Sequence, residues 1–65
     1  MRGVTKKDID SILKYLHEDQ AVINVVTRDG LLGRRPQIHL IVEDTIGVWT
    51  HIVFVYENDR WFFKL

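Results

Sequence analysis

The sequence contains no cysteine, a single proline and no excess of charge of either sign. Its 65 residues include nine Lys and Arg against nine Asp and Glu. Without cysteine there can be no disulfide, no thiolate zinc site and no cysteine nucleophile, a composition typical of reducing compartments. The balanced charge gives no indication of nucleic acid or an anionic membrane as the main partner.

Long apolar runs and catalytic signatures are also missing. The longest apolar stretch, Ile52 to Tyr56, falls far short of the about 20 residues that span a bilayer, and no signal-peptide stretch follows Met1. The segment around Gly30 and Gly33 lacks the Lys and Ser or Thr of a phosphate-binding loop. We therefore expect a cytoplasmic protein that is not an enzyme and that uses no cofactor.

A chain of this length forms one domain, residues 1–65. A domain of about 60 residues buries only about 60% of the surface that its unfolded chain exposes, so its stability is small. Small domains usually compensate with disulfides, a metal or association. Since disulfides are excluded here, association is the expected source of additional stability.

The periodicity of apolar residues changes once along the chain. Thr5 and Asp8 resemble a capping box, and they precede apolar residues at helical spacing that end at Leu16, which predicts an amphipathic helix over about residues 6–18. From Ala21 onward, β-branched and aromatic residues predict strands at about 21–27, 37–43, 48–56 and 60–64. The sequence thus predicts an α+β fold, with the N-terminal helix packed on one face of a three- to four-stranded antiparallel meander.

Two turn signals predict the strand register. A turn at 45–47 with Gly47 in the left-handed conformation pairs Leu40 with Ile52, and a two-residue turn at 58–59 pairs Tyr56 with Trp61. Both turns agree on the residues of the face that we assign to the helix. These residues are Ile38, Leu40, Val42, Val48, Ile52, Phe54, Tyr56, Trp61 and Phe63.

The opposite face of the predicted sheet is too apolar to remain in water. It carries His39, Ile41, Glu43, Trp49, His51, Val53, Val55, Phe62 and Lys64, and we expect the first strand to add Val22 and Val26. Large exposed apolar patches usually mark interfaces. We therefore predict a protein-interaction module, a homodimer or a binder of a larger protein, with Ile41, Trp49, His51, Val53, Val55 and Phe62 at the interface.

Two other hypotheses involve polar clusters. The predicted loop at 28–36 contains three arginines, Arg28, Arg34 and Arg35, clustered around its glycines. There they would meet a phosphate of nucleic acid or another anion. His39 and His51 would lie diagonally across two strands, with Glu43 nearby as a third metal ligand. The same two imidazoles would make association sensitive to pH, because two facing charges repel.

Overall fold

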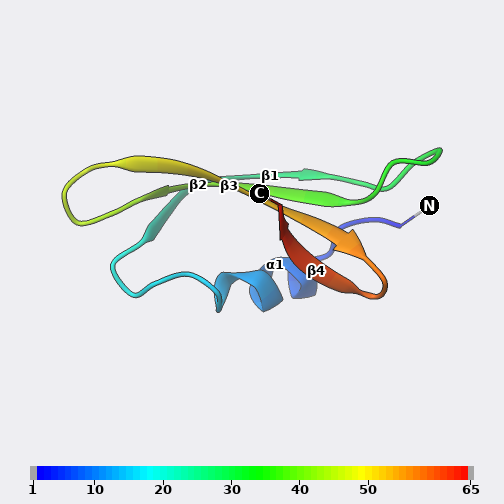
Figure 1. Ribbon diagram of the computed structural model, residues 1–65, viewed down its shortest axis with the longest axis horizontal. Helices are drawn as coiled ribbons and strands as arrows, with labels where there is room; N and C mark the ends of the chain where they lie inside the picture. Colours follow the sequence, from blue (N-terminus) through cyan, green and yellow to red (C-terminus); the bar gives the residue numbers. More distant parts are fainter. Residues whose placement is uncertain (1, 65) are drawn as a thin grey trace.

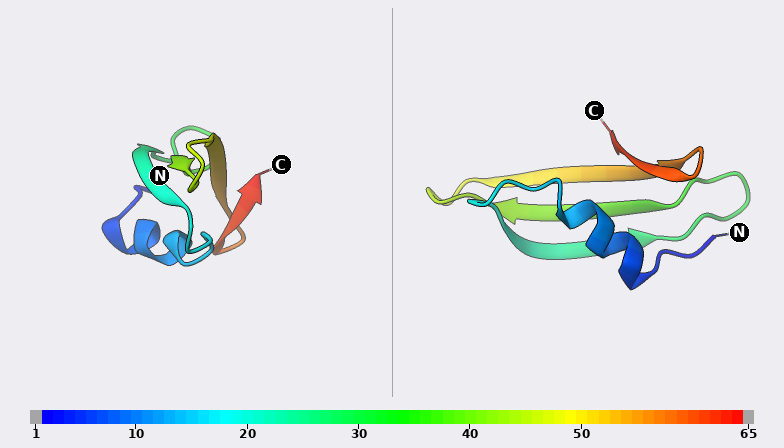
Figure 2. Two further views of the ribbon diagram at one scale, coloured as in Figure 1. Left: turned by 90° about the vertical axis from the view of Figure 1, so that its left-hand side faces the viewer. Right: turned by 90° about the horizontal axis from the view of Figure 1, so that it is seen from below.

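A computed structural model describes residues 2–64 of the chain and contains one helix and one antiparallel sheet. The elements are α1 (Lys6–Leu13), β1 (Ala21–Arg28), β2 (Gln37–Glu43), β3 (Trp49–Glu57) and β4 (Arg60–Lys64). The four strands lie in the order β1-β2-β3-β4, and α1 packs on one face of this meander (Figures 1 and 2). The predicted α+β fold is confirmed.

The helix begins as predicted but ends early. Thr5 and Asp8 form a capping box at its start, which satisfies backbone N–H groups that have no partner inside the helix. After Leu13 the chain forms a tighter turn, in which the Leu16 N–H donates to the carbonyl three residues earlier, that of Leu13, at 3.1 Å. Leu16 still packs against the core, so the apolar spacing continues through a turn that is not α-helical. The prediction of a helix to residue 18 was therefore wrong, and α1 covers only part of the sheet.

The predicted strand register is confirmed at both turns. Gly47 has φ +84°, and the Asp44 N–H donates to the Val48 carbonyl at 3.0 Å. Asn58 and Asp59 form the second turn, both with positive φ, a combination that suits the right-handed twist of the adjoining strands. Leu40 lies opposite Ile52 and Tyr56 opposite Trp61, as the turn chemistry requires.

The left-handed conformation of Gly47 should make it sensitive to substitution. Gly47→Ala should lower the free energy of unfolding by about 1 kcal/mol, because an L-residue is strained at this φ. An added Cβ would meet no atom within 4 Å, so the cost is conformational and not steric. Urea unfolding measures the change, with Gly3→Ala as the matched control because its backbone is not left-handed. Equal effects of the two substitutions would contradict the assignment.

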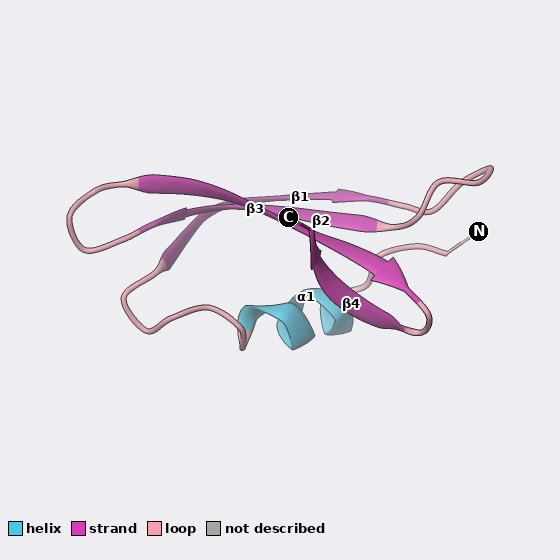
Figure 3. Ribbon diagram, in the orientation of Figure 1, coloured by secondary structure: helices cyan, strands magenta, loops and turns pink. Residues whose placement is uncertain are grey.

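The core lies between α1 and the inner face of the sheet. Its buried side chains are Ile12, Ile38, Leu40, Val42, Ile52 and Phe54. Strict alternation along β2 buries every second residue, as expected for a strand covered on one face. Val48 and Phe63 belong to the predicted inner face but are 51% and 58% exposed. Val48 precedes β3 and Phe63 lies on the edge strand β4, and the short helix packs on only part of the sheet (Figure 3).

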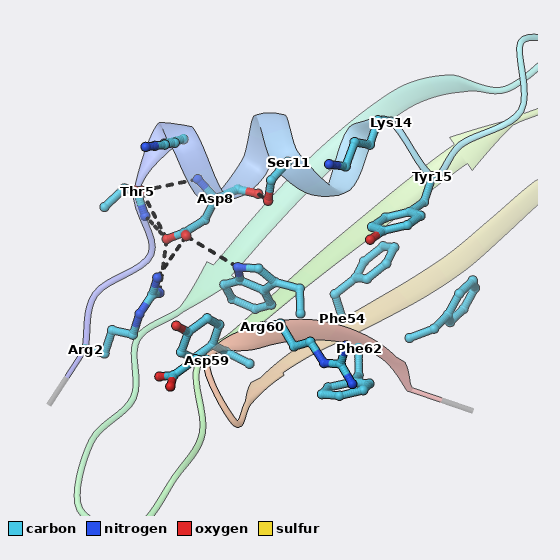
Figure 4. A pocket seen from close by; sticks show the side chains of 14 residues that line it. Arg2, Thr5, Asp8, Ser11, Lys14, Tyr15, Phe54, Asp59, Arg60 and Phe62 are labelled. Carbon is cyan, nitrogen blue, oxygen red and sulfur yellow. Dashed lines mark hydrogen bonds and ion pairs between the residues drawn. The ribbon is translucent and has the colours of Figure 1, made fainter.

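A buried carboxylate ties the start of α1 to the β3–β4 hairpin. Asp8 accepts two hydrogen bonds from the Arg2 guanidinium, at 2.9 and 3.1 Å, and one from the Thr5 N–H at 2.8 Å. The Trp61 indole N–H donates to the same carboxylate at 3.4 Å (Figure 4). The Arg2 guanidinium, followed by the Thr5 hydrogen bonds, holds the pKa of Asp8 well below its usual range despite the opposing effect of burial.

Candidate functional site

The face of the sheet that points away from α1 is open. None of the described residues forms a second layer over it (Figure 2). Its side chains line up in cross-strand rows because directly paired residues share a face. In order along the strands, the rows are Arg28, Gln37, Val55 and Phe62; then Val26, His39, Val53 and Lys64; then Asn24, Ile41 and His51; then Ala21, Glu43 and Trp49. We call this surface the open face.

The structure brings all six predicted interface residues to the open face. Trp49 is 62% exposed and Phe62 is 39% exposed, whereas Ile41, Val53 and Val55 are partly covered by their neighbours in the sheet. Val26 lies there as predicted and is 48% exposed. The result is a band of apolar side chains that runs across all four strands.

Val22 was assigned to the wrong face. It pairs with Val42, a core residue, and therefore lies on the inner face. The register of β1 shifts by one residue between Val22 and Asn24, and a bulge of this kind reverses the alternation on one side of it. The sequence carries no glycine or other signal at this position.

The two histidines meet at the centre of the open face. His39 Nδ1 lies 3.0 Å from His51 Nε2, and His39 Nε2 lies 2.9 Å from Gln37 Oε1. Because the amide oxygen accepts, His39 Nε2 carries its hydrogen and Nδ1 accepts from His51, an arrangement that suits two neutral rings. Burial, followed by the nearby positive groups His51, Arg28 and Lys64, lowers the pKa of His39.

The third predicted metal ligand does not join the histidines. The Glu43 carboxylate accepts a hydrogen bond from the Trp49 indole N–H instead. Within residues 2–64, no three His, Cys, Asp or Glu side chains are arranged to hold a metal ion. The metal hypothesis for His39, His51 and Glu43 was therefore wrong, because the cross-strand Trp49 takes the carboxylate.

The three arginines of the anion hypothesis are not gathered around one point. Arg28 lies on the open face opposite Gln37, whereas Arg34 and Arg35 belong to the β1–β2 loop and line a shallow hollow of about 450 Å³. Arg35 forms an ion pair with Glu57 at 3.3 Å, so part of the loop's charge is neutralised.

A groove on the helix side was not predicted from the sequence. It lies between α1 and the β3–β4 hairpin, has a volume of about 1000 Å³ and is lined by aromatic and basic side chains (Figure 4). Its lining combines residues of α1 and the segment before it with residues of β3 and β4, so the groove depends on how segments far apart in the sequence pack together.

Comparisons with protein-family models, with curated proteins and with solved structures found no match to this chain. Within residues 2–64, no helix is long and apolar enough to cross a membrane. The fold and the surface define the class as a small α+β protein with an antiparallel sheet that is covered on one face only.

Proposed function

We propose that this protein is a small, non-enzymatic interaction module that forms a homodimer by packing two open faces together. The observation that carries the proposal is the four-stranded sheet with a single covered face, whose other face carries apolar residues on every strand, Val26, Ile41, Val53, Val55 and Phe62. Contiguous apolar patches of this kind usually mark interfaces. A cytoplasmic location belongs to the same proposal and is in keeping with the absence of cysteine.

The size of the open face suits a dimer. The molecule measures 40 × 20 × 17 Å, with the strands along its long axis (Figure 1). The open face spans at most the 40 and 17 Å extents, because Figure 1 looks down the shortest axis and shows the sheet edge-on, so its footprint is at most roughly 700 Å², slightly below the about 800 Å² that each partner contributes to an interface of standard size. Two such sheets would stack about 10 Å apart as a sandwich.

The charges on the open face favour a second copy as the occupant. Glu43 lies in the last cross-strand row, and Arg28 lies in the first. A two-fold axis in the plane of the interface, perpendicular to the strands, would set the Glu43 row of each copy over the Arg28 row of the other. Within residues 2–64 neither side chain has an ion-pair partner in the monomer, so the dimer would form two new pairs.

Light scattering behind a sizing column tests the proposal. The wild type should show twice the chain mass of 7.7 kDa at micromolar to millimolar concentration. Ile41→Glu should raise the dissociation constant at least about 100-fold, because each copy would bury an unpaired carboxylate at the centre of the interface.

The chain offers a matched control. Ile46 lies in the β2–β3 turn outside the open face and is 82% exposed, so Ile46→Glu should leave the dimer intact. Circular dichroism should show both variants folded. A wild type that stays at one chain mass would overturn self-association and leave the open face to a larger protein. Equal dissociation constants for Ile41→Glu and Ile46→Glu would place the dimer contact outside the open face.

The nucleic-acid hypothesis for Arg28, Arg34 and Arg35 has less support. Arg28 belongs to the proposed dimer contact, and Arg35 pairs with Glu57. Nucleic-acid sites usually combine an unpaired basic surface with stacking aromatic side chains, and this loop offers only part of that combination.

A further inference from the structure

The groove between α1 and the β3–β4 hairpin has an aromatic floor. Phe54 lies at its centre, with ring centroids 6.2 Å from Tyr15 and 5.3 Å from Phe63. Phe54 itself is buried, but Tyr15 and Phe63 are 63% and 58% exposed. Tyr15 follows the helix and Phe63 belongs to β4, so the two exposed rings come from different elements that both contact Phe54. Tyr15 and Phe54 are labelled in Figure 4. A flat apolar group could pack between them over Phe54.

The rim of the groove is positively charged. Its basic side chains are Arg2, Lys7, Lys14 and Arg60, and its acidic ones are Asp8 and Asp59. The ion pair between Arg2 and Asp8 neutralises one charge of each sign. For Lys7, Lys14 and Arg60, the described part of the chain supplies no ion-pair partner. The groove therefore combines exposed aromatic rings with an excess of unpaired positive charge.

We propose that this groove binds a small amphipathic organic anion, a flat aromatic body that carries one acidic group. The aromatic body would lie between Tyr15 and Phe63, and the acidic group would face Lys14 and the other cations of the rim. The volume of about 1000 Å³ is at the upper end of sites for small molecules. The groove lies on the helix side of the sheet, and of its lining residues Phe62 and Arg60 on the edge strand β4 also belong to the open face. The inference is argued from the helix-side residues and does not depend on the proposed function.

The two tryptophans allow each side of the sheet to be observed separately. Trp61 lines the groove, whereas Trp49 lies on the open face. In a Trp49→Phe variant, Trp61 is the one remaining tryptophan, and its fluorescence reports on the groove alone. The probe is 8-anilinonaphthalene-1-sulfonate, an aromatic anion that accepts energy from tryptophan. Its uncharged counterpart, N-phenyl-1-naphthylamine, has the same rings without the sulfonate.

The expected result is saturable binding of the anionic probe, one per chain, that quenches Trp61. Phe63→Ser should weaken both probes roughly tenfold, because it removes one aromatic wall. Lys14→Gln should weaken only the anionic probe, by up to about fivefold. Lys6→Gln is the matched control, since Lys6 lies on the same helix outside the groove lining, and it should change neither probe.

Three results would overturn the proposal. They are the absence of saturable binding, binding that leaves Trp61 fluorescence unchanged, and binding that is insensitive to both Phe63→Ser and Lys14→Gln. The second result would place the probe on another surface. Because light scattering reports the dimer independently, failure at the groove and failure of self-association are distinguishable.

Discussion

Replacing Asp8 with alanine should lower the free energy of unfolding by about 3 kcal/mol, because its buried carboxylate accepts several charge-assisted hydrogen bonds, each worth about 1.5–3 kcal/mol, although its partner Arg2 is 37% exposed. The substitution would leave the Arg2 guanidinium and the Trp61 N–H without their shared acceptor. It would also remove the reciprocal half of the capping box with Thr5, which by itself is worth about 1 kcal/mol. For so small a domain, the total loss of about 3 kcal/mol is most of the about 3–5 kcal/mol of stability that a single core supplies.

Urea unfolding at neutral pH measures this effect, and the same helix provides a control. Asp10→Ala removes an exposed carboxylate and should change the free energy of unfolding by less than about 0.5 kcal/mol. Asp8→Asn keeps the shape and some of the hydrogen bonds, so its effect should fall between the two. Similar losses for Asp8→Ala and Asp10→Ala would show that the Asp8 network does not stabilise the fold.

The same carboxylate makes stability depend on pH. The pKa of Asp8 is lower in the folded chain than in the unfolded chain, so its contribution is fully present above about pH 4 and is lost as pH falls further. The wild type should therefore lose stability in acid more steeply than Asp8→Asn does. Unfolding curves between neutral pH and pH 2 measure the difference, and parallel curves would contradict the lowered pKa.

The strand register was predictable because short-range chemistry determines it. Gly47 and the Asn58-Asp59 pair specify their turns locally, and each turn fixes the pairing of the two strands that it joins. The period of two then places Ile41, Val53 and Val55 on one face without further information. The membership of the open face in β2, β3 and β4 followed from these two local facts, whereas that in β1 did not.

Other features depend on contacts between distant segments. The sequence shows Asp8 as a capping residue, but its bond to Trp61 joins residues 53 positions apart. The bulge between Val22 and Asn24 shifts the pairing of β1 with β2 by one residue and has no local signature. The groove likewise depends on how α1 and the β3–β4 hairpin pack together. The partner of the open face depends on a second molecule. The sequence of one chain therefore predicts only which residues the open face carries and what charge they bear.

Acid should dissociate the proposed dimer. Lowering the pH from 8 to 5.5 should raise the dissociation constant at least about tenfold, because each proton that the separated copies take up on opening contributes up to a factor of ten per pH unit. His39 and His51 share a hydrogen bond at the centre of the open face, and a second copy would withdraw both rings from water. Burial, followed by the nearby His51, Arg28 and Lys64, already lowers the pKa of His39, so the neutral pair is the form that the dimer would hold.

The chain's three histidines provide both the test and its control. A variant with His39→Asn and His51→Gln keeps polar side chains but cannot be protonated, and its dimer should persist at pH 5.5 in light scattering. His17 lies after the helix, away from the open face, so His17→Gln should dissociate in acid as the wild type does. Because acid also weakens the fold through Asp8, circular dichroism must show folded chains at pH 5.5. A folded wild type that remains dimeric there would mean that the two imidazoles lie outside the interface, which would move the contact toward Trp49 and Phe62.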